Sequence, residues 1–130
     1  MRVRELYMPD PVTVEPGAGL RHAATRMREQ GVGSLLIMRG ERLSGILTEH
    51  DIVAAVAEGL DLTTTPVGSY MTDDPVSVHP DRDSSDVAME MMERGVRHLP
   101  VVEDDRLLGM ISARDLLTAE AWPRMGGGER

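Results

Sequence analysis

The sequence contains no cysteine and no phenylalanine, and aromatic residues make up only 2% of its 130 residues. Without cysteine the chain forms no disulfide and no thiolate metal site, which fits a reducing, cytoplasmic setting. Its only aromatic side chains are Trp122, Tyr7 and Tyr70. These are too few to build a platform of rings on which nucleic-acid bases stack. Any bound base is therefore expected to lie between aliphatic side chains.

Long apolar runs and an excess of basic residues are also missing. No stretch approaches the roughly 20 apolar residues of a membrane span, and no signal peptide opens the chain, so no membrane association is expected. The formal net charge is −8, and this balance argues against nucleic-acid binding, which needs clustered cations to neutralise phosphates. Hydrophobic residues make up 41%, a proportion typical of a globular protein.

The sequence repeats itself after 64 residues. Residues 10–51 align without a gap on residues 74–115, and 15 of these 42 positions are identical. The segment Asp-Pro-Val-Thr-Val of the first copy meets Asp-Pro-Val-Ser-Val of the second. Two copies are too few for a solenoid, so the repeat indicates a pseudo-twofold pair.

Each copy predicts the same order of elements, β-α-β-β-α. Residues 12–14 are β-branched and predict a short strand. An apolar helical face follows and ends at a glycine, and Asp83 is expected to cap the helix of the second copy. The face comprises Leu20, Ala23, Ala24 and Met27 before Gly31 in the first copy, and Val87, Ala88 and Met91 before Gly95 in the second. Two apolar strands joined by a polar turn and a second helix complete each copy, at residues 35–47 and 99–111, with the helices ending at Gly59 and Pro123.

These elements predict an α/β (α+β) fold of two pseudo-symmetric repeats. The expected boundaries are 1–60 for the first repeat, 61–66 for a linker, 67–122 for the second repeat and 123–130 for a flexible, glycine-rich tail. A copy of about 50 residues is too small to be stable alone, so the two are expected to pack sheet to sheet. The cleft between them is the default ligand site.

One motif recurs at the second strand-to-helix junction of both copies: Gly, two apolar residues, Ser or Thr, two variable residues and Asp. It reads Gly45 to Asp51 and Gly109 to Asp115. A hydroxyl residue three positions before an acid is the pattern of a capping box, and a purely structural cap is the first interpretation. The second is a ligand site, because free N–H groups at a helix start attract phosphate and a carboxylate there accepts hydrogen bonds from a ribose diol. The two roles are compatible.

The motif and its surroundings resemble a known family. Tyr70 to Val78, Gly95 to Val102 and the two motif stretches together are similar to a tandem pair of CBS (cystathionine-β-synthase) domains, also called a Bateman module. The resemblance covers residues 3–118. It implies a non-catalytic regulatory module, of the kind used in energy sensing, that binds AMP, ADP or ATP and signals to an unidentified regulated protein by changing conformation.

The resemblance also implies site residues. In such modules the motif aspartate holds the ribose and the hydroxyl residue lies near the ribose or phosphate. On that pattern Thr48 and Asp51 serve one site, and Ser112 and Asp115 serve its pseudo-symmetric partner. Each site borrows residues from the other repeat's opening segment, which makes Ser69 a candidate for the Asp51 site. The matching residue for the Asp115 site is Glu5. Its carboxylate would repel phosphate, so the Asp51 site is favoured.

Phosphate contacts are expected from basic residues beside the motifs. Arg97 and His98 interrupt an apolar stretch, and an arginine can grip phosphate with two hydrogen bonds. The alternative is that Arg97 pairs with Glu93 and that His98 is a satisfied edge residue. Arg114 and His50 occupy variable positions of the motif, where a solvated helix face is the alternative to ligand contact.

Other functions receive less support. The four histidines lack metal-ligand spacing, so no metal site is predicted, although Mg²⁺ could accompany a nucleotide at the acidic clusters 81–83 and 103–105. No nucleophile–base pair emerges, so no enzyme is predicted. A homodimer is expected through the helices near residues 20–30, 49–58, 84–94 and 113–121. The alternative function is a ligand-independent structural or dimerisation module in which the motifs are only helix caps.

Overall fold

The structure is a computed structural model that describes residues 1–118. The chain forms two compact units. The repeat-1 unit is Pro11–Pro75, and the repeat-2 unit combines Met1–Asp10 with the chain from Val76 onward. The predicted tail at 123–130 and the predicted helix end at Pro123 lie outside the described residues.

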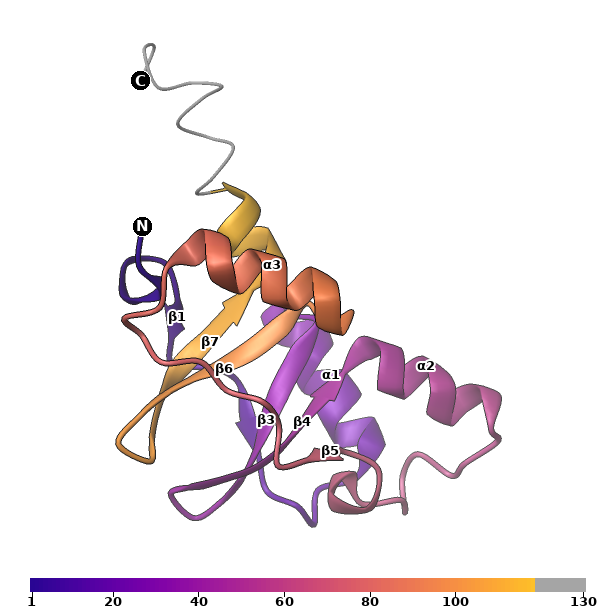
Figure 1. Cartoon of the computed structure of the whole chain (residues 1–130). Helices are drawn as coiled ribbons and strands as arrows, with labels where there is room; N and C mark the ends of the chain where they lie inside the picture. Colours follow the sequence, from indigo (N-terminus) through magenta and orange to yellow (C-terminus); the bar gives the residue numbers. More distant parts are fainter. Residues whose placement is uncertain (119–130) are drawn as a thin grey trace. The chain divides into compact units, whose positions relative to one another are not determined.

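The repeat-1 unit is built on a four-stranded sheet of order β2-β3-β4-β5. Strands β2 and β3 are parallel, and the other two pairings are antiparallel. Helices α1 and α2 pack beside this sheet (Figure 1). The elements are β2 (Thr13–Val14), α1 (Leu20–Gln30), β3 (Ser34–Arg39), β4 (Arg42–Thr48), α2 (Glu49–Ala57), the 3-10 helix η2 (Val67–Ser69) and β5 (Thr72–Asp73).

The repeat-2 unit has a three-stranded sheet of order β1-β7-β6. Val78 adds a single parallel bridge to Val101, in the place that β2 takes in the other unit. Helix α3 covers the β6–β7 hairpin, and residues 113–118 are helical (Figure 1). The elements are the 3-10 helix η1 (Val3–Glu5), β1 (Met8–Pro9), α3 (Ser84–Arg94), β6 (His98–Glu103) and β7 (Arg106–Ser112). The predicted order β-α-β-β-α is confirmed in repeat 1, and in repeat 2 with its opening strand reduced to the bridge at Val78.

Each unit has its own apolar core, made by the residues whose spacing predicted it. The helical face of α1 and the strands β3 and β4 form one core, and α3 with β6 and β7 forms the other. The caps also agree with the prediction. Gly31 and Gly95 end α1 and α3 in the left-handed conformation, with φ of 66° and 68°, and Asp83 accepts a 3.1 Å hydrogen bond from the N–H of Ser85.

The opening segment of each repeat is paired with the other repeat's hairpin, in agreement with the borrowing of segments that the family resemblance implies. β1 pairs with β7 in the repeat-2 unit, where Pro9 lies opposite Gly109. β5 pairs with β4 in the repeat-1 unit, where Asp73 lies opposite Gly45. Residues 67–75, which the sequence assigns to the second repeat, therefore pack within the repeat-1 unit.

The motif glycines make this exchange of segments possible. A Cβ on Gly45 would lie 2.8 Å from the carbonyl oxygen of Thr72 and would also collide with the side chain of Met71. A Cβ on Gly109 would lie 2.6 Å from the ring of Tyr7 and still closer to the carbonyl oxygen of Met8. Glycine stands first in the motif because a neighbouring backbone passes too close for any side chain.

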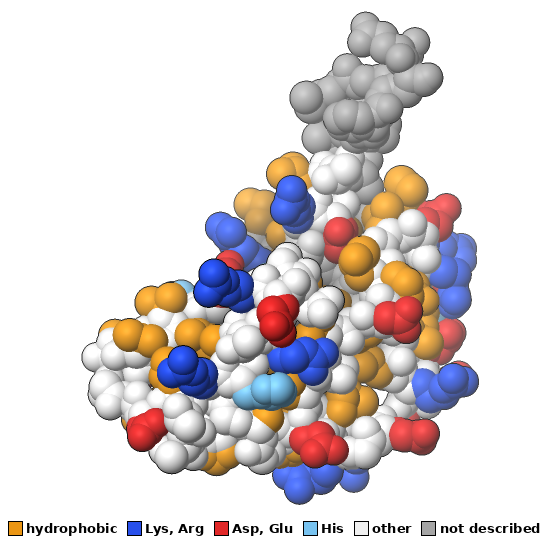
Figure 2. Space-filling view, turned by 180° about the vertical axis from the view of Figure 1, so that it is seen from behind, with side chains coloured by type: hydrophobic (Ala, Val, Ile, Leu, Met, Phe, Trp, Pro, Cys, Tyr) orange, Lys and Arg blue, Asp and Glu red, His pale blue; other side chains and the backbone are white. Residues whose placement is uncertain are grey.

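The described surface carries mixed charge. On the face shown in Figure 2, basic and acidic side chains are interspersed, and no continuous basic patch is visible. Among residues 1–118, no helix combines the length and the apolar character that a bilayer crossing requires.

Candidate functional site

The strand-to-helix junction of the repeat-1 unit is a closed capping box. Thr48 is the N-cap of α2, and its Oγ1 accepts a 3.3 Å hydrogen bond from the N–H of Asp51. In return, Oδ2 of Asp51 accepts a 2.8 Å bond from the N–H of Thr48 and a 3.1 Å bond from its hydroxyl. The structural interpretation of the motif is therefore realised in the geometry.

The junction of the repeat-2 unit repeats this arrangement. The N–H of Ser112 donates to Oδ2 of Asp115 at 2.9 Å, and the N–H of Asp115 donates to Oγ of Ser112 at 3.1 Å. Both aspartates are half-buried. Among residues 1–118, the second carboxylate oxygen, Oδ1, accepts no hydrogen bond in Asp51 or in Asp115. The cap therefore uses one oxygen of each aspartate and leaves the other available to a ligand.

Free donors at the two helix starts are fewer than the sequence suggested. The N–H of Glu49 donates to the carbonyl of Gly33 at 2.9 Å, and the N–H of Ala113 donates to the carbonyl of Arg97 at 2.8 Å. Together with the capping boxes, these bonds occupy two N–H groups of each first turn. These N–H groups are therefore already paired and are not free donors for a phosphate.

The basic candidates gather at the Ser112 junction. His98 lies opposite Ser112 in the β6–β7 register, and Arg97 immediately precedes β6. Arg114 is in the first turn of the helix that Ser112 caps, and both arginines are exposed. Within residues 1–118 Arg97 forms no ion pair, so the alternative pairing with Glu93 is absent there.

The matching positions of the repeat-1 unit carry no such charge. Gly33 and Ser34 stand in place of Arg97 and His98, and Ser34 lies opposite Thr48 in the β3–β4 register. His50 takes the place of Arg114 and is exposed. The two junctions share their capping geometry but differ in charge, and the positive charge belongs to the repeat-2 unit.

Ser69 lies in the same unit as Asp51, because the opening segment of repeat 2 packs there. It is exposed, and its hydroxyl donates to the carbonyl of Pro66 at 2.8 Å. The next residue, Tyr70, donates its phenol O–H to Oε2 of Glu58 at 2.8 Å. That hydrogen bond chiefly raises the pKa of Tyr70, with a further contribution from the negative charge of Asp51. Sequence reasoning placed Ser69 at this junction but missed its neighbour Tyr70, although the same opening segment carries both residues.

Two other features of the structure lie apart from these junctions. A cavity of about 620 Å³ in the repeat-1 unit is lined by β2, α1 and the β3–β4 turn, and none of the predicted site residues lines it. In the repeat-2 unit, His79, Asp81 and Glu103 come together at the surface. Sequence reasoning named the acidic clusters 81–83 and 103–105 as possible Mg²⁺ positions, but it did not join them to each other or to His79, because Glu103 is distant in sequence. The pair His79 and Asp81, two residues apart, was the available signal.

Comparisons with known proteins agree with this architecture. The model of the CBS domain matches residues 3–58 and 67–121. Among curated proteins, the chain is 36% identical to an uncharacterised 17.7 kDa protein of Acidianus ambivalens, over 91% of this chain and 72% of that protein. It is 30% identical to the CBS domain-containing protein YhcV of Bacillus subtilis, over 88% of this chain and 81% of that protein.

Solved structures show the same fold. A signal-transduction protein with CBS domains from Burkholderia ambifaria superposes with a TM-score of 0.86 at 30% identity, covering 90% of this chain and 87% of that one. The CBS domain protein PAE2072 of Pyrobaculum aerophilum, solved in complex with AMP, superposes with a TM-score of 0.81 at 29% identity, covering 88% and 89%.

Proposed function

Because the chain belongs to the CBS-domain family and contains two CBS domains, we propose that it is a regulatory module that binds an adenine nucleotide at its strand-to-helix junctions. One observation carries the proposal. Both motif aspartates are fixed by their capping boxes through Oδ2, while Oδ1 stays available to accept a ribose hydroxyl. The AMP complex of the relative from Pyrobaculum aerophilum supports an adenosine-containing ligand.

In this proposal the two junctions divide the work. Asp51 and Asp115 hold ribose hydroxyls through Oδ1, and Thr48 and Ser112 keep those carboxylates in place. Arg97, Arg114 and His98 bind the phosphate. The positive charge of these residues favours the Ser112 junction for a phosphorylated ligand, whereas the carboxylate of Glu5 made the Asp51 junction the one expected from the sequence. Ser69 and Tyr70 border the Asp51 junction. AMP, ADP and ATP, with or without Mg²⁺, are the ligands to test first.

The test measures thermal stability and calorimetric binding with AMP, ADP, ATP and adenosine. A ligand at 100 times its Kd adds about 2.7 kcal/mol to the free energy of unfolding. For a chain of this size, that corresponds to a rise in Tm of roughly 8–16 °C. The alternative function, a ligand-independent structural or dimerisation module, predicts no rise with any nucleotide.

The variants must separate capping from ligand binding. Asp115→Ala removes both roles, so lost binding could reflect a frayed helix. Asp115→Glu is the matched control, because glutamate at this position closes a capping box but moves the carboxylate by one methylene. We expect Asp115→Glu to unfold within about 0.5 kcal/mol of the wild type and to bind AMP at least tenfold more weakly. If the double variant Asp51→Ala/Asp115→Ala binds AMP as tightly as the wild type, the two aspartates do not hold the ribose.

The module is proposed to be non-catalytic, cytoplasmic and dimeric. Exposed apolar side chains on the helices support self-association: Val53 and Val56 on α2, Met89 and Met92 on α3, and Leu117. Long incubation with ATP followed by chromatography tests for hydrolysis, and unchanged nucleotide is the expected result. The regulated protein is expected to bind the nucleotide-loaded and nucleotide-free forms with different affinities.

A further inference from the structure

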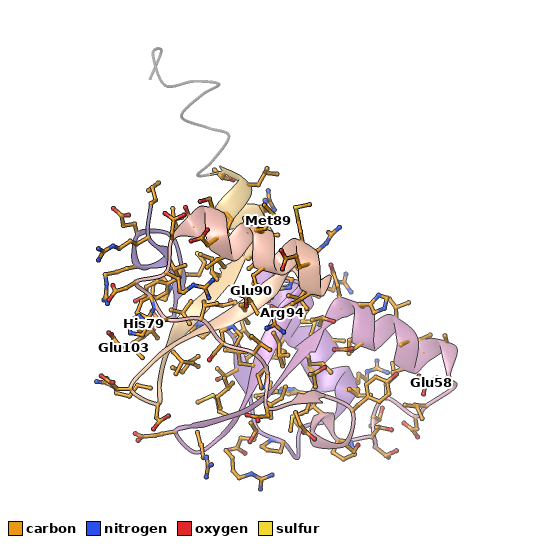
Figure 3. The ribbon with its side chains drawn as sticks, viewed as in Figure 1. Glu58, His79, Met89, Glu90, Arg94 and Glu103 are labelled. Atoms are coloured by element: carbon orange, nitrogen blue, oxygen red, sulfur yellow. The ribbon has the colours of Figure 1, made fainter. Side chains whose placement is uncertain are left out.

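Three potential metal ligands meet at the surface of the repeat-2 unit. His79 and Asp81 come from the segment before α3, and Glu103 comes from the end of β6. One ligand atom from each lies within 4.8 Å of the others. Figure 3 shows the side chains of His79 and Glu103 next to each other, and Nε2 of His79 is 3.4 Å from Oε2 of Glu103. We refer to these three residues as the His79 cluster.

The composition and spacing of the His79 cluster match a site for a zinc-like ion. One imidazole nitrogen and two carboxylates form a donor set that Zn²⁺ accepts. Zinc bonds to nitrogen and oxygen of about 2.0–2.2 Å place neighbouring ligand atoms roughly 3.4 Å apart in a tetrahedron. The separation of His79 Nε2 and Glu103 Oε2 already has this value. The side chains are between one-third and one-half exposed, so an ion can reach them and water can complete its coordination.

Without a metal, arginine neutralises the His79 cluster. Nε of Arg4 lies 3.0 Å from Oδ1 of Asp81, and its NH2 lies 3.4 Å from Oε2 of Glu103. Arg2 is more distant, at 3.8 Å from Asp81. Oε2 of Glu103 faces both the guanidinium of Arg4 and Nε2 of His79, so the guanidinium and a metal ion would compete for this oxygen.

We propose that the His79 cluster binds one divalent transition-metal ion of the zinc type, in exchange for the guanidinium of Arg4. The ion takes Nε2 of His79 and one oxygen each from Asp81 and Glu103, and the proton on Nε2 moves to Nδ1, so that the imidazole stays neutral. The N–H of Asp81, which now donates to Nδ1 at 3.1 Å, then loses this acceptor. The exchange changes the charge at the contact between the opening segment and the rest of the repeat-2 unit, and it needs no nucleotide.

The test is a titration of the full chain with Zn²⁺ in competition with a chromophoric chelator. We expect one ion per chain and no competition from millimolar Mg²⁺, which prefers oxygen ligands and retains its water. His79→Ala and Glu103→Gln are expected to weaken binding at least tenfold. The matched controls are His22→Ala, an exposed histidine of the other unit, and Asp104→Asn, the acid next to Glu103, and both should bind as the wild type does.

Arg4→Gln provides the decisive comparison. Exchange predicts that this protein binds Zn²⁺ several-fold more tightly, because the competing cation is gone. Equal or weaker binding by Arg4→Gln, with an unchanged circular dichroism spectrum, refutes the exchange. An equal loss in His22→Ala and His79→Ala refutes the location. Visible absorption of bound Co²⁺ gives a second readout, and its absence in the wild type at saturating Co²⁺ also refutes the site.

Discussion

In the repeat-2 unit, the backbone of Gly109 lies so close to the opening segment that a Cβ atom has no room there. Replacing Gly109 by alanine therefore tests why the motif begins with glycine. In Gly109→Ala the new Cβ would meet the carbonyl oxygen of Met8 and the ring of Tyr7, whose Cδ2 would be only 2.6 Å away. Carbon atoms pack at about 3.5–4.0 Å, so the neighbours must move by roughly 1 Å. The obstacle includes backbone, which cannot rotate away as a side chain can.

The expected loss in the free energy of unfolding follows from this steric clash. Overpacking costs about 1–3 kcal/mol, and a backbone obstacle places Gly109→Ala near 3 kcal/mol. Relief requires β1 to leave β7, which would give up the pairing of Met8 with Met110. Gly45→Ala should cost less, about 1–2 kcal/mol, because part of its obstacle is the flexible side chain of Met71. Gly17→Ala is the control, because no atom lies within 4 Å of its added Cβ.

Urea unfolding followed by far-ultraviolet circular dichroism measures all three variants. We expect the order Gly17, Gly45, Gly109 from the smallest to the largest loss, with Gly17→Ala within about 0.5 kcal/mol of the wild type. At roughly 3–6 °C per kcal/mol, Gly109→Ala should lower Tm by about 9–18 °C. If Gly109→Ala unfolds within error of Gly17→Ala, the opening segment does not pair with β7 as described.

Other perturbations test the electrostatics and the surface. The pKa of Asp81 is lowered in the folded protein, first by its hydrogen bond with Arg4. The ionised carboxylate therefore stabilises the fold above the unfolded-state pKa, and this stabilisation is lost as the pH falls through the folded-state pKa. Tm measured from pH 7 to pH 2.5 should therefore fall less steeply in Asp81→Asn than in the wild type. The raised pKa of Tyr70, due first to Glu58, contributes stability below about pH 10 that is lost at higher pH. Absorbance at 295 nm should show a late tyrosine titration that Tyr70→Phe removes, and a late transition that survives in Tyr70→Phe would refute this assignment. Met92 is 79% exposed on α3, so Met92→Glu should leave the unfolding curve of dilute protein in place but shift sedimentation toward the monomer; an unchanged dimer would move the interface elsewhere.

The sequence predicted the secondary structure well where the signal is local. Helical spacing at Leu20 and Met27 and the glycine at Gly31 defined α1, because side-chain periodicity and left-handed glycine act within one helix. Asp83 was identified as a cap for the same reason. The opening strand of repeat 2 was predicted less well. It shrinks to a bridge at Val78, since three β-branched residues indicate extended chain but not how many of them find a partner.

The candidate site was predicted in part. The motif spacing gave Thr48 with Asp51 and Ser112 with Asp115, and both pairs are in contact. The spacing did not show that first-turn N–H groups are taken by Gly33 and Arg97, since those contacts join neighbouring strands. The ribose and phosphate roles stay predictions, for which the structure supplies the available oxygens and the exposed cations.

By itself, the sequence determined the duplication, which an alignment of the chain with itself shows directly. It also determined the order of elements in each repeat and the capping motif, because these depend on residues only a few positions apart. Only the tertiary structure decided which residues of each opening segment pair with the other repeat's hairpin, that Gly45 and Gly109 accommodate this pairing, and that Arg4 meets the His79 cluster. These features join residues tens of positions apart. Their contacts depend on strand register and backbone path, which local side-chain patterns do not encode.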